Sequence, residues 1–345
     1  MKVEKLQMVA GSGERRRTDS FDHRRLVRSE QMTERSGHDI AMKRLALTAA
    51  SLARDLMDPE ADLAPVSVVI PCYRCADTIA SAVASVAAQK LRPAEVLLVD
   101  DDSGDGTLER LKAIARICPD GWVKVLSVAR NGGPSVARNL GWRHASQTWI
   151  AFLDADDTWH PHKLSLQMNV LASDPKICLL AHRVNVQLRT DPPPALCYPL
   201  KVKICQRHLM RFRSSFATPS VVLRRDLPFR FDENRRRAED FLLWAQILLS
   251  GYRCAQINQV LASLHKQPFG DGGLSGDLKA MHDAGDDVRR TLYAEGLIGP
   301  WQLRTLFLTS ALRYARRHVL TYVRRVAANR RARQAGIETR SRTIP

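Results

Sequence analysis

The sequence has no apolar run that approaches the roughly 18–20 residues needed to span a bilayer. Its first residues, MKVEKLQMVAGSGERRR, also have no apolar stretch typical of a secretory signal. The chain is nonetheless not poor in hydrophobic residues: they make up 45% of its 345 residues, which is enough for a buried core and excludes collagen-like and wholly disordered classes. We therefore expect a cytoplasmic protein that is soluble or peripheral to the inner face of the cell membrane.

Cysteines are few and scattered. There are seven, an odd number that argues against a disulfide framework and for a reducing compartment. Cys72 and Cys75 form a C-x-x-C pair, which occurs in redox sites and in half of some zinc sites. Tetrahedral zinc needs four ligands, however, and no second such pair or paired histidine follows. The sequence therefore favours small apolar side chains at these two positions over chemistry.

Acidic residues are scarce relative to basic ones, and the formal net charge is +17. The excess is local: residues 289–345 carry 13 basic and 2 acidic groups, residues 200–240 carry 11 and 5, and residues 61–199 carry 14 of each. Such an excess indicates an anionic partner, whether a membrane, a phosphorylated substrate or nucleic acid. The neutral middle of the chain and the absence of aromatic RNA-binding motifs argue against nucleic acid.

Apolar runs alternate with helical patterns from Pro65 onward. β-branched and apolar runs bounded by turn residues indicate buried strands, and we expect Pro71 to end the first of them. Strands that alternate with helices predict parallel βαβ units in an open sheet covered on both faces. The expected strands are Val66–Ile70, Glu95–Asp100, Val123–Val128 and Trp149–Leu153, and the expected helices are Thr78–Gln89, Gly106–Cys118, Ser135–Ala145 and His162–Leu171.

Acidic clusters follow two of these strands, at the sheet edge where ligands of open α/β sheets bind. One is Asp100–Asp102. The other begins with Asp154 and Asp156, a D-x-D pair whose oxygens suit a hard divalent cation such as Mg²⁺ or Mn²⁺ bridged to a diphosphate. The alternative is an ordinary acidic turn in which Asp157 or Thr158 caps the next helix.

Four motifs in order resemble glycosyltransferase family 2, the inverting transferases with a GT-A fold that bind nucleotide sugars. They are VSVVIPCY, EVLLVDDDSGDGT, RNGGPSVARNLG and WIAFLDADDTWHPHKL, and together they cover Pro65 to about Leu171. The later AEDFLLWAQIL resembles the family's Glu-Asp site at a helix start. The stretch HKQPFGDGGLSGDL resembles a loop of bacterial members that build surface polysaccharides.

The resemblance implies roles for residues on the nucleotide side. Pro71 and Tyr73 would line a uridine or guanosine pocket, and Asp101 would recognise the base. Arg138 matches a basic residue near the nucleotide, and Asp154 would lie on the ribose side. Two departures leave the base and the sugar open, since Arg74 stands where the family often has Asn and Asp102 where it often has Gly.

The resemblance also implies the chemistry. Asp156 would coordinate a divalent cation, Mg²⁺ or Mn²⁺, and Asp240 would act as general base with Glu239 beside it. His265 would contact the diphosphate if its glycine-rich loop closes over the donor. The residues alone favour the simpler interpretation that Glu239 and Asp240 are first-turn acids stabilised by a helix dipole.

The resemblance and the charge pattern together suggest four segments. Residues 1–63 would be a poorly ordered extension, 64–171 the nucleotide-sugar-binding half, 172–288 the acceptor and catalytic half, and 289–345 basic amphipathic helices with a tail. The function implied is metal-dependent transfer of a hexosyl group from a UDP- or GDP-linked sugar to a glycan or lipid-linked acceptor in exopolysaccharide, lipopolysaccharide or O-antigen synthesis. An alternative activity is direct transfer of the sugar to a polyprenyl phosphate. The alternative outside the enzymes is a basic nucleic-acid-binding protein, which the sequence favours less.

Two basic regions leave alternatives open. The basic stretch between Lys201 and Arg237 forms either solvated and packing surfaces of an acceptor region or a platform for a phosphorylated acceptor such as a lipid diphosphate, and Arg235–Arg237 are its members closest to Asp240 in the sequence. The C-terminal segment either packs on the domain with a solvated arginine face or docks on an anionic membrane. Its apolar residues at helical spacing are Leu308, Leu312, Ala315, Val319, Tyr322, Val323 and Val326, and its arginines include Arg313, Arg316, Arg317, Arg324 and Arg325.

Overall fold

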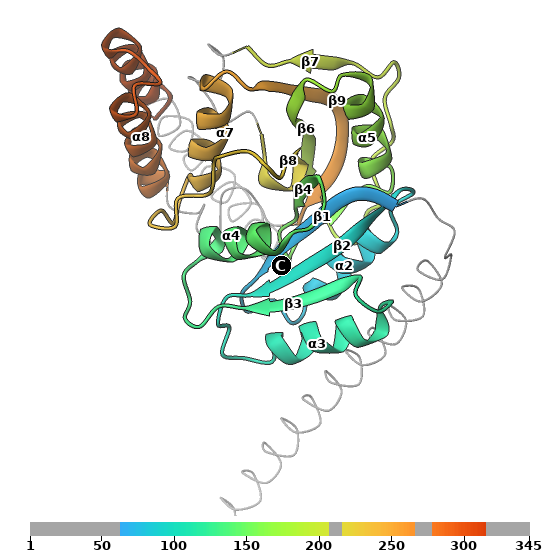
Figure 1. Ribbon diagram of the computed structural model, residues 1–345. Helices are drawn as coiled ribbons and strands as arrows, with labels where there is room; N and C mark the ends of the chain where they lie inside the picture. Colours follow the sequence, from blue (N-terminus) through green and yellow to red (C-terminus); the bar gives the residue numbers. More distant parts are fainter. Residues whose placement is uncertain (1–62, 207–215, 266–277, 315–345) are drawn as a thin grey trace, which may run out of the picture. The chain divides into compact units, whose positions relative to one another are not determined.

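The structure is a computed structural model that describes residues 63–206, 216–265 and 278–314. Strands in these ranges form one nine-stranded sheet in the order β3-β2-β1-β4-β8-β6-β9-β5, with β7 paired to β9 (Figure 1). The bounds are β1 Leu63–Cys72, β2 Arg92–Asp100, β3 Val123–Ser127, β4 Trp149–Phe152, β5 Thr158–Trp159, β6 Ile177–Val186, β7 Val202–Ile204, β8 Val222–Arg224 and β9 Arg253–Leu264.

The first four strands in this order are parallel, as the alternating pattern predicts, and β8 runs antiparallel between β4 and β6. The sheet is therefore open and mixed. It is continuous across the two segments that the sequence suggested, because β4 of the first pairs with β8 of the second.

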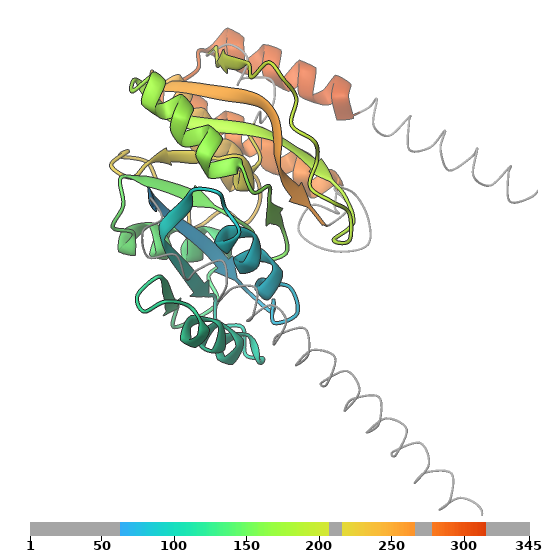
Figure 2. The same cartoon turned by 90° about the vertical axis from the view of Figure 1, so that its right-hand side faces the viewer.

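Helices cover both faces of the sheet. On one face α2 (Ile79–Ala87), α3 (Thr107–Ile117) and α5 (Lys163–Ser173) pack with side chains such as Val68 of β1. On the other face α4 (Pro134–His144) and α7 (Glu239–Leu249) pack with side chains such as Val69. In Figure 2, α2 and α5 lie on the near side of the sheet. Because neighbouring β1 residues such as Val68 and Val69 face opposite layers, both must be apolar, which is why VVI at residues 68–70 is an uninterrupted apolar run.

A third apolar cluster joins α7 to α8 (Leu278–Ala294) and to the helical residues 300–314. The helical extension predicted after residue 289 is thus present as far as residue 314. Residues 1–62, the glycine-rich loop after His265 and the arginines from Arg316 onward lie outside the described residues.

Two details of the sequence prediction are wrong. Strand β1 does not end before Pro71 but continues to Cys72, where Pro71 pairs with Val99 of β2. The backbone carbonyls of Val69 and Cys72 accept from Leu153 on the β4 side and Asp101 on the β2 side, so Pro71 faces the β4 side. Strand β4 has already ended there, at Phe152, and the missing N–H of the proline therefore leaves no ladder bond unmade.

The second error concerns the start of α5. Thr158 belongs to the short strand β5, which pairs with β9, and the residue at the N-cap of α5 is His162. The carboxylate of Asp157 instead accepts a hydrogen bond from the backbone of His265. Neither Asp157 nor Thr158 caps the helix.

Candidate active site

Arg138 joins the end of β4 to the start of α7. Its guanidinium donates to Asp154 Oδ1 at 2.8 Å and to Glu239 Oε1 at 3.0 Å, and it lies 5.3 Å from the ring centroid of Phe231. The residue is only 5% exposed. Burial alone would lower its pKa, but the two carboxylates outweigh this and raise it, so Arg138 stays charged. Three residues that the sequence assigned to the nucleotide and to catalysis are thereby brought together.

Asp240 follows Glu239 in the first turn of α7. Its Oδ1 accepts from the backbone N–H of Phe241 at 2.7 Å, and its Oδ2 accepts from the Thr218 hydroxyl at 3.3 Å. Burial and then the like charge of Glu239 raise the pKa of Asp240 to about 6, against the opposing effect of Arg138. A carboxylate with such a pKa is largely ionised at neutral pH yet more basic than an ordinary aspartate, which suits a general base.

Asp101 holds the loop between β3 and α4. Its carboxylate accepts from the backbone N–H groups of Gly132 and Gly133 at 3.0 and 2.8 Å, and from Asn131 Nδ2 at 3.0 Å. Gly133 has φ 87°, a conformation that favours glycine. Burial raises the pKa of Asp101, although these hydrogen bonds and the nearby Arg236 charge oppose the rise. Asp101 thus fixes the shape of this loop, and base recognition stays a prediction.

The turns that follow β1 and β2 lie beside this loop. Tyr73 is half exposed, and the backbone N–H of Arg74 donates to Ser103 Oγ, which in turn donates to Asp100 Oδ1 at 2.6 Å. Arg74 and Asp102 have φ values of 48° and 53°. These are the two positions where the sequence departs from the expected Asn and Gly, and the left-handed backbone explains why those residues are usual there.

The D-x-D pair offers oxygen ligands at the same edge. Asp154 and Asp156 are both partly exposed, and the backbone carbonyl of Asp156 accepts from the Arg189 guanidinium. Among the described residues no three His, Cys, Asp or Glu side chains gather as a metal site. One or two carboxylates completed by substrate phosphates and water are nevertheless what Mg²⁺ commonly uses, so these residues fit a divalent cation bound together with the donor.

His265 lies at the end of β9. Its Nε2 is 2.9 Å from Thr158 Oγ1, and its Nδ1 is 3.0 Å from the carbonyl of Gln187. Both ring nitrogens therefore have protein partners. The predicted contact with the diphosphate would require one of these hydrogen bonds to be exchanged, and it stays a prediction.

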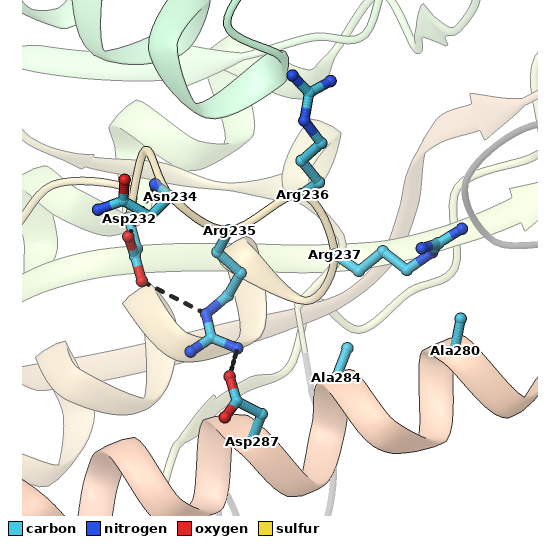
Figure 3. Close-up of a pocket in the computed structure, with 8 residues that line it drawn as sticks. All are labelled: Asp232, Asn234, Arg235, Arg236, Arg237, Ala280, Ala284 and Asp287. Carbon is cyan, nitrogen blue, oxygen red and sulfur yellow. Dashed lines mark hydrogen bonds and ion pairs between the residues drawn. The ribbon is translucent and has the colours of Figure 1, made fainter.

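The three arginines before α7 point in different directions (Figure 3). Arg235 lies between Asp232 and Asp287, with its Nη1 2.7 Å from the Asp287 carboxylate, and it links the loop to α8. Arg236 points away from α8, and a Cβ atom on Gly133 would lie 3.9 Å from its Nη1. The loop and α8 line a pocket of about 400 Å³. The arginines thus do not form a single platform.

Three contributors to the site were not identified from the sequence: Thr218, Arg189 and Arg236 in its position beside Gly133. The run ATPSVVL signals a strand, but nothing in it indicates that Thr218 meets an acid 22 residues later.

The C-x-x-C pair is buried. Both Cys72 and Cys75 lie in the core, and burial, together with the neighbouring Cys75 thiol, raises the pKa of Cys72.

The comparisons with known proteins agree with this arrangement. A family model described as glycosyl transferase family 2 matches residues 67–226. The chain is 32% identical over 217 residues to the succinoglycan biosynthesis protein ExoO of Rhizobium meliloti. This alignment covers 57% of this chain and 60% of ExoO. It is 31% identical over 214 residues to the UDP-Glc:alpha-D-GlcNAc-diphosphoundecaprenol beta-1,3-glucosyltransferase WfgD of Escherichia coli, covering 59% of this chain and 81% of WfgD.

Solved structures show the same fold. The S. aureus TarS 1-349 complex with UDP-GlcNAc has a TM-score of 0.53 at 20% identity, covering 66% of each chain. The mannosyltransferase PcManGT from Pyrobaculum calidifontis, in complex with GDP-Man and Mn²⁺, has a TM-score of 0.50 at 19% identity, covering 82% of this chain and 92% of PcManGT. The GT-A-like architecture expected from the sequence is confirmed.

Proposed function

The chain belongs to glycosyl transferase family 2, and from this premise we propose that it transfers a hexosyl group from a nucleotide-diphospho-sugar to an acceptor hydroxyl, with inversion, during synthesis of a bacterial surface polysaccharide. One observation carries the proposal. The ion pairs of Arg138 with Asp154 and Glu239 hold the D-x-D strand end next to Asp240, a half-buried acid whose pKa is raised to about 6.

Asp240 is the proposed general base. The acceptor oxygen forms its bond to the anomeric carbon as the bond from that carbon to the diphosphate oxygen breaks, and the hydroxyl proton passes to the Asp240 carboxylate. The nucleoside diphosphate leaves with the electron pair of the broken bond. A single displacement from the face opposite the leaving group gives inversion. Hydrogen bonds from Thr218 and from the Phe241 backbone orient the carboxylate.

The donor is proposed to lie along the ends of β1, β2 and β4. Tyr73 and Pro71 would line the base pocket, whose shape depends on the loop that Asp101 holds. Asp156, with Asp154 beside it, would hold the divalent cation. When bound, such a cation stabilises the charge that develops on the leaving diphosphate. Arg138 keeps Asp154 in place from the protein side.

The donor nucleotide is proposed to be UDP or GDP, and the acceptor a lipid-linked glycan. The relatives support both choices, because WfgD is named for UDP-Glc and a diphosphoundecaprenol acceptor and PcManGT was solved with GDP-Man. A lipid-linked acceptor would bring the enzyme to the membrane surface. No helix in the described ranges combines the length and hydropathy needed to cross a bilayer.

A donor-hydrolysis screen tests the proposal. We expect the purified chain to release UDP or GDP slowly from one nucleotide sugar in the presence of Mg²⁺ or Mn²⁺, and to lose this activity on exhaustive chelation. Ligand-induced thermal stabilisation by the same nucleotide, dependent on the cation, provides a second readout. Failure to release or bind any nucleoside diphosphate would overturn the proposed function, and full activity after chelation would remove the metal from it.

A further inference from the structure

An apolar stripe lies on the outer face of the helical residues 300–314. Trp301, Leu308 and Leu312 are 77%, 61% and 63% exposed. They are seven and four residues apart, a spacing that places them on one side of an α-helix. The guanidinium of Arg304 lies over the Trp301 ring, 5.3 Å from its centroid, on the same exposed side. We call Trp301, Leu308 and Leu312 the C-terminal stripe.

The opposite side of this helix is already in use. Leu306 is 1% exposed and packs in the cluster that contains Phe241 and Leu242 of α7 and Val288 of α8. Ser310 is buried as well, and its hydroxyl lies 3.3 Å from His282 Nδ1. The inner face of the helix, with Leu306 and Ser310, therefore makes the core contacts and fixes how the helix is rotated. The C-terminal stripe lies on the opposite face, which points outward.

The charge of this part of the sequence selects the partner of the stripe. Residues 300–314 contain Arg304 and Arg313 and no acidic residue, and residues 289–345 carry 13 basic and 2 acidic groups, of which nine arginines and one glutamate follow residue 314 in the sequence. An arginine-rich sequence segment whose helix exposes large apolar side chains is the pattern of an interfacial amphipathic helix, which inserts its apolar side chains while its cations meet anionic headgroups.

We propose that the C-terminal stripe docks the protein on the surface of an anionic phospholipid bilayer. Two other occupants fit the charges and the apolar side chains less well. A second copy of this segment would bring two strongly positive segments together. A nucleic acid backbone would satisfy the arginines but leave Trp301, Leu308 and Leu312 in water.

Docking through this stripe would also orient the proposed active site. Phe241 and Leu242 follow Asp240 directly and share their apolar cluster with Leu306 of the docking helix. The base is therefore tied to the membrane-facing helix through one packed unit. This last step rests on the proposed function, because it matters only if the acceptor is lipid-linked.

Vesicle sedimentation of the full chain tests the docking. We expect binding to phosphatidylglycerol-containing vesicles, little binding to pure phosphatidylcholine, and weaker binding at high salt. The double variant Leu308→Ser/Leu312→Ser should bind at least about tenfold more weakly, since each leucine that leaves water stabilises the bound state appreciably. Leu188→Ser/Tyr198→Ser removes two apolar side chains that are even more exposed, from the segment between β6 and β7, and should leave binding unchanged.

Donor hydrolysis in solution separates this proposal from the proposed function, because the stripe variant should hydrolyse the donor at the wild-type rate. Equal binding of the stripe variant and wild type to anionic vesicles would overturn the docking site. So would equal binding of the wild type to neutral and anionic vesicles. A wild-type dimer that the stripe variant abolishes, without any vesicle binding, would assign the stripe to self-association instead.

Discussion

Two acids at opposite ends of the sheet strands, the buried Glu95 and the half-buried Asp240, have pKa values that are shifted in opposite directions. Glu95 lies near the amino ends of β2, β3 and β4, where it accepts from Ser67, Ser146 and Lys124. Burial alone would raise its pKa, but these hydrogen bonds outweigh it and lower the pKa to about 2. Asp240, near the carboxyl ends, has fewer donors and a like charge beside it, and its pKa is raised to about 6.

The backbone shows the same contrast. Arg74, Asp102 and Ala238 have left-handed φ values, and no other non-glycine residue in the described ranges does. Arg74 and Asp102 follow β1 and β2, and Ala238 precedes the two acids of α7. Left-handed backbone and raised carboxylate pKa values thus gather at the carboxyl edge, where function is expected, whereas the pKa of the amino-end acid Glu95 is lowered by its hydrogen-bond donors.

Replacing Asp240 should give the largest effect. Asp240→Asn removes the proposed base, and we expect sugar transfer to fall by about 10²–10⁴-fold. The melting temperature should not fall, because the change removes a like charge next to Glu239. Asp226→Asn is the control, since Asp226 is exposed and forms an ion pair with Arg224, two residues before it. Near-wild-type turnover by a folded Asp240→Asn protein would remove Asp240 from its role.

Glu95 should respond in the opposite way. Glu95→Gln places an amide among four donors, and we expect a loss of about 2 kcal/mol in the free energy of unfolding with little change in turnover below the melting transition. Because folding lowers the pKa of Glu95, its contribution is present above the ordinary glutamate pKa and is lost as the pH falls towards about 2. Urea titrations from pH 7 to pH 3 should therefore show wild type and variant converging. A constant difference would contradict the assignment.

The sheet was predictable where sequence alone decides the outcome. The four apolar runs became β1 to β4. Most residues of β1, β2 and β4 are buried, and strands buried on both faces must be largely apolar, whereas β3 lies at the sheet edge and exposes Lys124. The length of β1 was not predictable, since whether Pro71 breaks it depends on where β4 ends. In the same way, the spacing of Leu308 and Leu312 predicted a helix face, but only the packing of Leu306 shows which face is outward.

Part of the candidate site was likewise predictable from the sequence, and part of it was not. That Asp154 and Arg138 would lie close together follows from the rule that carboxyl ends of parallel strands meet at one edge. Their pairing with Glu239 does not, because Glu239 is 101 residues from Arg138 and reaches it only through the packing of α7 on the sheet. Contacts of this kind depend on the tertiary arrangement, as does the hydrogen bond from Thr218 to Asp240.

Glu239 should tune the base. The rate of transfer should fall tenfold per unit as the pH drops below about 6, because protonated Asp240 cannot accept the acceptor proton. Glu239→Gln removes the like charge, so the pKa of Asp240 should fall and this acid limb should move down by roughly one pH unit. Glu233→Gln makes the same change at an exposed position bonded to Asn139 and should leave the limb in place. If the acid limb of the pH–rate profile does not move in Glu239→Gln, the charge of Glu239 does not set the pKa of Asp240.

The smallest effect tests the strain before α7. Ala238 has φ 55° and ψ 24°, a conformation that glycine adopts without its Cβ contact, so Ala238→Gly should raise the free energy of unfolding by up to about 1 kcal/mol. Ala245→Gly makes the same substitution within the right-handed, buried part of α7 and should instead lower it by about 1 kcal/mol or more. Chemical denaturation of both variants gives the comparison, and turnover of Ala238→Gly should match wild type because the contacts of Asp240 are kept. If both substitutions destabilise equally, the turn stores no strain, and the contrast between the two ends of the sheet rests on their acids alone.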